Sequence, residues 1–353
     1  MGVLNSNLYL SDIEKIISLL DWLCLPSDKK ILITGATGLI CSSVVDVLYS
    51  LNKRRNLNWK IFIAARNIEK AKERFSEFSD SGTISFVQYD ASKSCDFPRG
   101  IDYIVHGAGN AYPAVFNEFP AETLSTSIFG LEKILQYAIK NKSRVLYISS
   151  SEVYGQLQNT NPIKENEYGY VDILNSRSAY PMGKRAAETL CSSYIKEFSS
   201  DCVIVRPGHI YGPTASKSDN RVSSDFMYKA ANGENLILKS DGKQIRSYCY
   251  CLDCASAIVV TLFMGKTGEA YNISNPCSIC SIREMAESMA KAGHVECKFE
   301  LPCEKEKKSF NPMLNSSLDS KKIEQLGWSA VFSKAEGFEH SVNICKSILL
   351  NID

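Results

Sequence analysis

The sequence has little excess of charge of either sign. Its 353 residues include 40 Lys and Arg against 39 Asp and Glu, for a formal net charge of +1. Proteins that bind nucleic acid or acidic membranes through a broad surface carry a clear basic excess. We therefore expect no nucleic-acid partner, and any anionic ligand must be bound locally, by a helix amino-terminus or by single arginines.

The sequence also lacks an apolar run of transmembrane length, so no membrane insertion is expected. Its first segment carries acidic residues within the apolar pattern and has neither the basic start nor the uninterrupted apolar stretch of a signal peptide. The apolar residues Ile13, Ile16 and Leu20 recur at helical spacing, which predicts an amphipathic helix over residues 11–24. We interpret residues 1–28 as a helical extension that packs on the main domain.

Cysteines are numerous, and their number is odd: there are 13, without a secretory context, which indicates reduced thiols and a cytoplasmic location. Two C-x-x-C pairs, Cys251/Cys254 and Cys277/Cys280, leave a structural zinc site open. The gap between the pairs contains a helical pattern, from Ala255 to Met264, instead of the short turn of a zinc ribbon, and Cys251 alternates with tyrosines as in a strand. We therefore expect no metal, and we interpret these thiols as small buried apolar groups.

Short apolar runs alternate with helical patterns from residue 29 to residue 206. The strand-like runs are 30–34, 60–64, 85–89, 103–106, 144–149 and 202–206, and the helical patterns between them include 121–141 and 178–198. This alternation predicts an α/β fold, a doubly wound parallel sheet of the Rossmann type, over residues 29–206. The irregular pattern of residues 207–353 predicts a smaller C-terminal substrate-binding domain, with a segment of about 245–275 returning to the sheet.

A glycine-bearing turn follows the first predicted strand and opens a helix. Its sequence, TGATGLIC, runs from residue 34 to residue 41. Glycines at such a turn let backbone N–H groups approach a pyrophosphate at the positive end of the helix. The usual third glycine is Cys41, which still fits tight packing of helix on strand. The residues predicted to hold a dinucleotide here are Gly35, Thr37, Gly38, Leu39 and Ile40.

The end of the second predicted strand bears on which nicotinamide cofactor is bound. NAD-binding proteins usually carry an acid there for the ribose 2′-hydroxyl, whereas arginine favours the 2′-phosphate of NADP. This sequence has Arg66 and no acid at that position. We therefore expect NADP(H) to be preferred, with NAD(H) as the alternative, and Asp90 after the third strand to lie near the adenine.

The predicted catalytic group consists of Ser150, Tyr180 and Lys184. Positions 180 and 184 share one face of a helix, so the phenol and the ammonium can act as a unit. An ammonium at ~4 Å is expected to lower the pKa of the phenol. Tyr180 can then exchange a proton with a substrate hydroxyl or ketone during hydride transfer, while Ser150 polarises the same oxygen.

With these motifs the sequence resembles the extended short-chain dehydrogenase/reductase family, from about residue 29 to residue 328. The matching segments are TGATGLI from residue 34, HGAG from 106, SSSEVYG from 149, YPMGK from 180, RPGHIYGP from 206, GKQIRSY from 242, GEAYNI from 268 and LDSKKIEQLGW from 318. The resemblance implies a nucleotide-sugar substrate, catalysis by the same three residues and a homodimer. It also implies that Arg246 binds the substrate diphosphate, and Arg221 is a weaker candidate for binding the same nucleotide.

Two departures from the family pattern make substrate inference less direct: Ser127 and His209 stand where relatives usually have asparagine. Dehydratases resemble one another in an Asp–Glu pair after the catalytic Ser or Thr. Here the pair is Ser151-Glu152, which disfavours dehydration. Glu152 and His209 are therefore expected to contact substrate.

Three reactions stay open. Because Arg66 suits net reduction, the first-ranked reaction is NADPH-dependent reduction of a 4-keto-6-deoxyhexose on a nucleotide such as dTDP, for surface polysaccharide synthesis. The Ser-Glu pair, the distant Arg246 and the segment Arg177-Ser-Ala-Tyr180 resemble UDP-glucuronate decarboxylases. Decarboxylation is thus the first alternative and C4 epimerisation the second. Both reactions recycle the cofactor.

A non-enzymatic dinucleotide-binding sensor is the remote alternative. Some proteins keep the dinucleotide fold and lose the tyrosine, whereas Ser150, Tyr180 and Lys184 are all present here. If the protein is a sensor, Tyr180→Phe is expected to leave its function unchanged.

Overall fold

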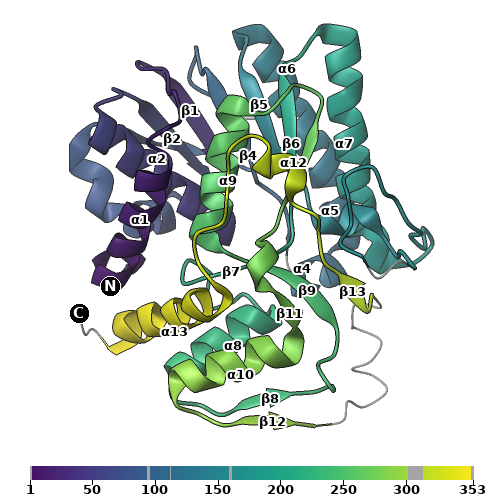
Figure 1. The fold of residues 1–353 in the computed structure, drawn as a ribbon. Coiled ribbons are helices and arrows are strands. Elements are labelled where there is room, and N and C mark those ends of the chain that lie inside the picture. The colour runs from purple at the N-terminus through teal and green to yellow at the C-terminus, as the bar shows by residue number, and fades with distance from the viewer. Residues whose placement is uncertain (1, 94–95, 112, 159–160, 301–312, 351–353) are drawn as a thin grey trace.

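The computed structural model describes residues 2–350, apart from 94–95, 112, 159–160 and 301–312. A seven-stranded sheet forms its centre, in the order β10-β6-β5-β4-β1-β2-β3, and every pairing within it is parallel (Figure 1). In that order the strands are Ala270–Ile273, Cys202–Pro207, Arg144–Ile148, Tyr103–His106, Lys30–Thr34, Lys60–Ala65 and Ile84–Gln88. The predicted doubly wound α/β sheet is confirmed.

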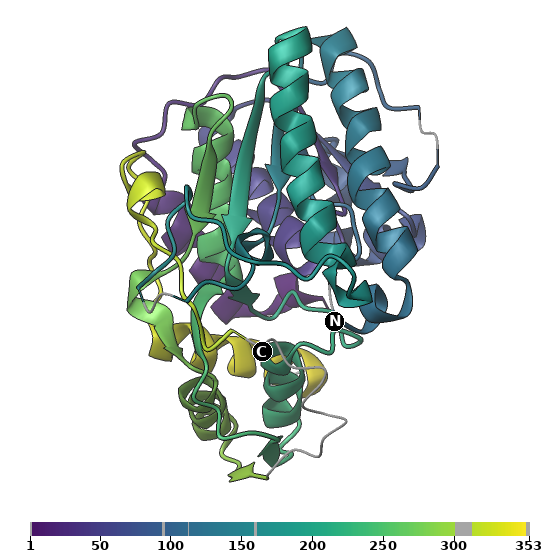
Figure 2. The ribbon, with the colours of Figure 1, turned by 90° about the vertical axis from the view of Figure 1, so that its right-hand side faces the viewer.

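Both faces of the sheet are buried. Successive side chains along a strand point to opposite faces, so each face has its own set of apolar residues. In β1, Ile31 and Ile33 belong to one apolar core and Leu32 belongs to the other. The first core includes side chains of α2 (Leu39–Arg55) and α9 (Cys251–Met264). The second includes side chains of α6 (Leu131–Asn141) and α7 (Ala179–Phe198), which run side by side in Figure 2.

Past β6 the chain builds a second, smaller layer at the carboxyl edge of the sheet. Strand β9 (Ile245–Tyr250) pairs there with β7 (His209–Tyr211), β11 (Ile279–Ser281) and β13 (Asn315–Ser316). The helices of this part are α8 (Val222–Ala231), α10 (Ile282–Gly293) and α13 (Lys334–Leu350), and β8 (Leu236–Leu238) pairs with β12 (Cys297–Phe299). The chain also returns to the large sheet, since β10 extends it beside β6 and α9 covers its face.

Helix α1 (Asn7–Leu19) packs on α2, α9 and α13. It begins and ends before the predicted limits of 11 and 24. The helix ends where the chain turns at Leu20, whose N–H donates to the carbonyls of Ile17 and Ser18. Buried polar contacts fix it in place: the Tyr9 hydroxyl donates to Asp46 over 2.7 Å, and the Tyr250 hydroxyl donates to Asp12 over 3.0 Å.

The predicted helical segment over 121–141 is helical throughout, but it is not one regular α-helix. The structure has α5 (Pro120–Ser125), a π-helical turn at Thr126–Gly130 and then α6. The hydroxyls of Thr126 and Ser127 donate to carbonyls of the preceding turn, both over 2.7 Å, an interaction that loosens regular helical bonding. The turn matters for the site because Ser127 packs against Gly183 of α7, the glycine next to Lys184.

The strand-like interpretation of Cys251 is also wrong, because α9 starts at this residue, four positions before the predicted start at Ala255. Cys251, Cys254 and Cys280 are buried, whereas Cys277 is exposed. Within the described ranges, no three His, Cys, Asp or Glu side chains are grouped so that they could hold a metal ion. Over the same ranges, every helix is too short or too polar to cross a membrane.

The contact of His340 with Asp12 links α13 to α1 and should make stability depend on pH. The imidazole Nδ1 lies 3.0 and 3.1 Å from the two carboxylate oxygens, and this hydrogen bond raises the pKa of His340. The stabilisation is therefore complete below the ordinary histidine pKa of ~6.5 and is lost as pH rises through the raised value. We expect His340→Gln to lower Tm more at about pH 5.5 than at about pH 8.5.

The control is His294→Gln, at an exposed histidine that ends α10. Calorimetry of both variants at the two pH values checks the expectation. A loss of Tm for His340→Gln that is equal at the two pH values would contradict it.

Candidate active site

A cavity of about 1030 Å³ lies between the carboxyl edge of the large sheet and the smaller C-terminal layer. Parallel strands end at one edge, so side chains from distant parts of the chain meet there. The cavity brings together all the site residues that the sequence predicted: Gly35, Thr37, Gly38, Leu39, Ile40, Arg66, Asp90, Ser150, Glu152, Tyr180, Lys184, His209, Arg221 and Arg246. Their individual roles stay predictions.

The turn between β1 and α2 fits a dinucleotide diphosphate. Gly35 has a φ of +69°, and a Cβ there would lie 2.8 Å from the backbone carbonyl of Gly107. Helix α2 follows Gly38, which supplies no side-chain cap to the first N–H groups. Uncapped amides at a helix amino-terminus attract an anionic diphosphate, so the residues present suit a nicotinamide dinucleotide.

The adenosine end of the cavity carries two cations. Arg66 follows β2 on the exposed surface, and Lys70 lies in the first turn of α3 (Ile68–Arg74), where the side chain of Asn67 accepts a hydrogen bond from its N–H. Hydrogen bonds from Ser92, together with the charges of Lys93 and Arg66, hold the pKa of Asp90 below its usual value. The sequence analysis missed Lys70, although a second cation four residues after Arg66 was a readable signal.

Helix α7 places Tyr180 and Lys184 one turn apart, and a 3₁₀ turn (Ser151–Tyr154) capped by Ser150 faces them. Lys184 Nζ donates to the carbonyl of Ile148 over 2.8 Å and lies 6.0 Å from the centre of the Tyr180 ring. The carbonyl at the end of β5 thus holds the Lys184 ammonium beside the Tyr180 phenol.

The expected lowering of the Tyr180 pKa by Lys184 is wrong for this structure. Burial raises the pKa of Tyr180 to about 12, a hydrogen bond with Ser150 opposes the rise, and Glu152 adds to it. Burial also lowers the pKa of Lys184 to about 8, with Glu188 as the main opposing charge. The phenol is therefore held in its neutral, proton-carrying form here, because desolvation outweighs the neighbouring cations.

An ion pair beside Tyr180 had not been predicted. The two terminal nitrogens of Arg177 contact the two carboxylate oxygens of Glu152 over 2.9 and 3.0 Å. The Phe116 ring of α4 (Pro113–Glu118) stacks on the Tyr180 ring, with centroids 5.0 Å apart, and the Arg177 guanidinium lies over the same phenylalanine at 5.5 Å. Arg177 could have been found from its place three residues before Tyr180, whereas nothing in the sequence indicated Phe116.

Three predicted substrate residues line the far end of the cavity. Arg246 is buried and donates to the carbonyls of Ile245 and Met313, and no carboxylate of the described residues pairs with it. Arg221 is paired with Asp219 through two nitrogens. Burial lowers the pKa of His209 to about 3, so its ring is neutral. Arg246 is thus the buried cation best placed for a substrate anion.

The family model for the NAD dependent epimerase/dehydratase family matches residues 31–274. Among curated proteins, UDP-glucuronic acid decarboxylase 6 of Arabidopsis thaliana is 29% identical over 311 residues, covering 88% of this chain and 87% of the relative. UDP-glucuronic acid decarboxylase 1 of Xenopus tropicalis is 27% identical over 319 residues, covering 89% of this chain and 72% of the relative.

Solved structures share the fold. UDP-glucuronic acid 4-epimerase from Bacillus cereus, in complex with UDP-glucuronic acid and NAD, has a TM-score of 0.76 at 20% identity and covers 90% of this chain and 99% of its own. The dTDP-glucose 4,6-dehydratase DesIV from Streptomyces venezuelae, with NAD bound, has a TM-score of 0.77 at 22% identity and covers 92% and 99%.

The position of Tyr180 at the cavity wall leads to a first test of catalysis. We expect Tyr180→Phe to lower kcat by about 10²-fold or more, since it removes the group that exchanges the substrate proton. Tyr170→Phe, at an exposed tyrosine, is the matched control and should leave kcat unchanged. Full turnover by a folded Tyr180→Phe protein would contradict a catalytic role for this tyrosine.

Proposed function

The chain belongs to the NAD dependent epimerase/dehydratase family, and from this premise we propose that it removes CO₂ from a nucleotide-linked uronic acid of the UDP-glucuronate type. This reaction was the alternative in the sequence analysis, behind keto-reduction. The curated relatives, named as UDP-glucuronic acid decarboxylases, support it better than they support reduction.

The observation that carries the proposal is that three side chains share the cavity with Tyr180. Glu152, Arg177 and Arg246 give the sequence its resemblance to decarboxylases, and all three line the one cavity. Glu152 and Arg177 are held together by two hydrogen bonds. This arrangement supplies charge of both signs beside the phenol, where a sugar carboxylate would lie.

The residues present suit a sequence of oxidation, decarboxylation and reduction. A bound nicotinamide would supply the chemistry of taking a hydride from the sugar C4 and returning it. For this step Tyr180 must act as a phenolate, a form that burial disfavours and that the positive charge of a bound oxidised nicotinamide would favour. Tyr180 would then take the proton of the C4 hydroxyl, with Ser150 bonding the C4 oxygen. The C4 ketone makes the sugar a β-keto acid. The bond from C5 to the carboxylate then breaks and CO₂ leaves. The electron pair of that bond stays on the sugar as an enolate, which Ser150 and Tyr180 stabilise until C5 is protonated.

A direct assay tests this proposal. We expect the purified protein, given UDP-glucuronate, to release one CO₂ per sugar and to show no net change in absorbance at about 340 nm, because the cofactor is recycled. Labelled CO₂ and NMR of the product are the measurements. UDP-glucose is the control substrate, since it has no carboxylate to lose. Conversion of UDP-glucuronate at C4 with its carboxylate retained would indicate an epimerase instead.

Reduction of a 4-keto sugar by NADPH is the second candidate, and Arg66 with Lys70 favours it. Two cations at the ribose end suit a 2′-phosphate. Steady consumption of NADPH with a dTDP-4-keto-6-deoxyhexose would select this reaction over decarboxylation.

The same two cations lead to an expected cofactor preference. We expect the double variant Arg66→Ala, Lys70→Ala to weaken NADP(H) binding about tenfold or more and to change NAD(H) binding little, because only the former carries the phosphate. Lys72→Ala, at an exposed lysine of the same helix, is the control. Fluorescence titration measures both affinities. Equal effects on the two cofactors would contradict the preference.

We also propose that the protein acts in the cytoplasm as a homodimer. The described cysteines are free thiols, as reducing surroundings require. Leu124 and Phe129, beside α7, leave 36% and 56% of their surface exposed, which suits burial against a second copy.

A further inference from the structure

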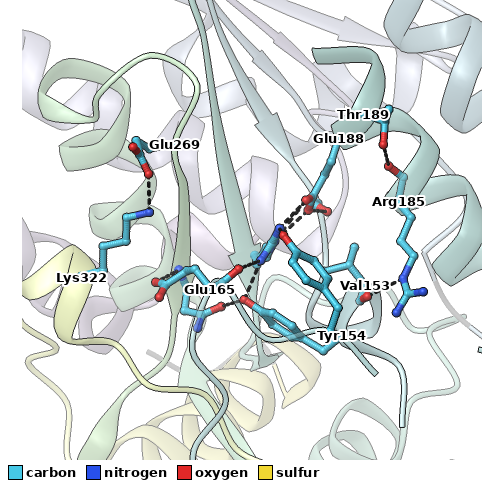
Figure 3. A network of polar contacts seen from close by, with 12 residues as sticks. Val153, Tyr154, Glu165, Arg185, Glu188, Thr189, Glu269 and Lys322 are labelled. Carbon is cyan, nitrogen blue, oxygen red and sulfur yellow. Dashed lines mark hydrogen bonds and ion pairs between the residues drawn. The ribbon is translucent and has the colours of Figure 1, made fainter. Parts of the chain in front are cut away.

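A network of buried charges lies behind the cavity and touches its lining at Ser149. Figure 3 shows Glu188 on α7 at its upper end and Tyr154 below it. Neither Glu188 nor Arg206 is among the described residues that line the cavity. The network therefore needs an explanation other than contact with substrate or cofactor.

Arg206, near the end of β6, is the hub. Its side chain is 3% exposed, and it directs its N–H groups to Glu188, to the hydroxyls of Tyr154 and Tyr168, and to the carbonyl of Glu165. The shortest of these contacts is 2.6 Å, from Nη2 to a carboxylate oxygen of Glu188. A buried guanidinium with its donors satisfied in this way is a rigid anchor.

Glu188 joins this anchor to the catalytic group. Its carboxylate accepts from Arg206 and, over 2.5 Å, from the hydroxyl of Ser149, the residue before Ser150. It also follows Lys184 by four positions on α7, so the two side chains lie on one helix face. A single carboxylate thus contacts the end of β6, the strand end that carries Ser150 and the surroundings of Lys184.

We infer that Glu188 is a positioning residue of the reaction, acting through Lys184 and through the Ser149–Ser150 strand end without touching substrate or cofactor. The inference rests on the proposed function only in taking Tyr180 and Lys184 as the reacting pair. It therefore holds equally for decarboxylation, epimerisation and reduction.

The charges around Lys184 support this assignment. The titratable groups that face it are Cys41 from α2, His106 from β4, Tyr147 from β5, and Tyr180, Glu188 and Cys191 from α7. Burial raises the pKa of Cys41 and of both phenols and lowers that of His106 to about 3. The hydrogen bond with Cys202, together with burial, raises the pKa of Cys191, so these groups are neutral near pH 7. The paired carboxylate of Glu188 is then the negative charge that opposes loss of the Lys184 proton.

The test removes this charge and keeps the shape. The variant Glu188→Gln should move the pH at which Lys184 loses its proton down by about one pH unit. Labelling with acetic anhydride across a pH series, read by mass spectrometry of the Lys184 peptide, measures this on the intact protein without any substrate. The alkaline limb of the kcat profile should move by the same amount, so that turnover at about pH 9 falls about tenfold.

Two further variants keep the test decisive. Glu188→Asp retains the charge one methylene further back, should fold if Glu188→Gln does not, and should give a smaller shift in the same direction. Glu269→Gln is the matched control, because Glu269 bonds Lys322 over 2.7 Å at the far side of Figure 3 and should leave both readouts unchanged.

Folded Glu188 variants with unchanged labelling and kcat profiles would overturn the inference. So would a labelling shift with no change in the kcat profile, since Glu188 would then affect Lys184 without affecting the reaction. If UDP-glucuronate is not a substrate, the labelling result still decides the effect on Lys184, so the failure of the proposed function is distinguishable from the failure of this inference.

Discussion

Arg206 is buried as a cation at the point where β6 leaves the sheet, and its demand for partners organises the region around the site. A buried charge is tolerated only when it is paired and its hydrogen bonds are satisfied. Arg206 meets that demand with Glu188, Tyr154, Tyr168 and a backbone carbonyl. As a result, the end of β6, the catalytic helix and the turn after Ser150 are held in one fixed relation.

The same network reaches the C-terminal part of the chain. The Tyr154 hydroxyl donates to Asn272 of β10 over 2.5 Å, and the Asn272 amide donates to the carbonyls of Ile163 and Asp319. Asn272 is fully buried, so these contacts are protected from competition by water. The edge strand β10 is thereby joined to the backbone at Ile163 and Asp319.

Local pairing also explains how a protein with a net charge of +1 could bind the dianionic nucleotide sugar that we propose as its substrate. Some of the cavity cations already have a carboxylate partner: Arg177 has Glu152, Arg221 has Asp219 and Lys229 has Asp225. Arg246 is held by backbone carbonyls instead and forms no salt bridge with a described carboxylate, although the charge of Glu152 acts on it. Attraction of an anion is therefore confined to a few points of the cavity, and the surface as a whole need not be basic.

The sequence by itself determined the sheet, because alternation of apolar runs with helical periodicity follows from local spacing. It also pointed to the glycine turn, Ser150, Tyr180 and Lys184, because each of them belongs to a short sequence motif. It could not determine the pKa of Tyr180, since burial by Phe116 and the surrounding strands outweighs Lys184. The π-helical turn at Thr126–Gly130 and the network of Glu188 and Arg206 also needed the tertiary structure. Their partners lie far apart in the chain, and only folding decides which polar groups lose water and must find each other.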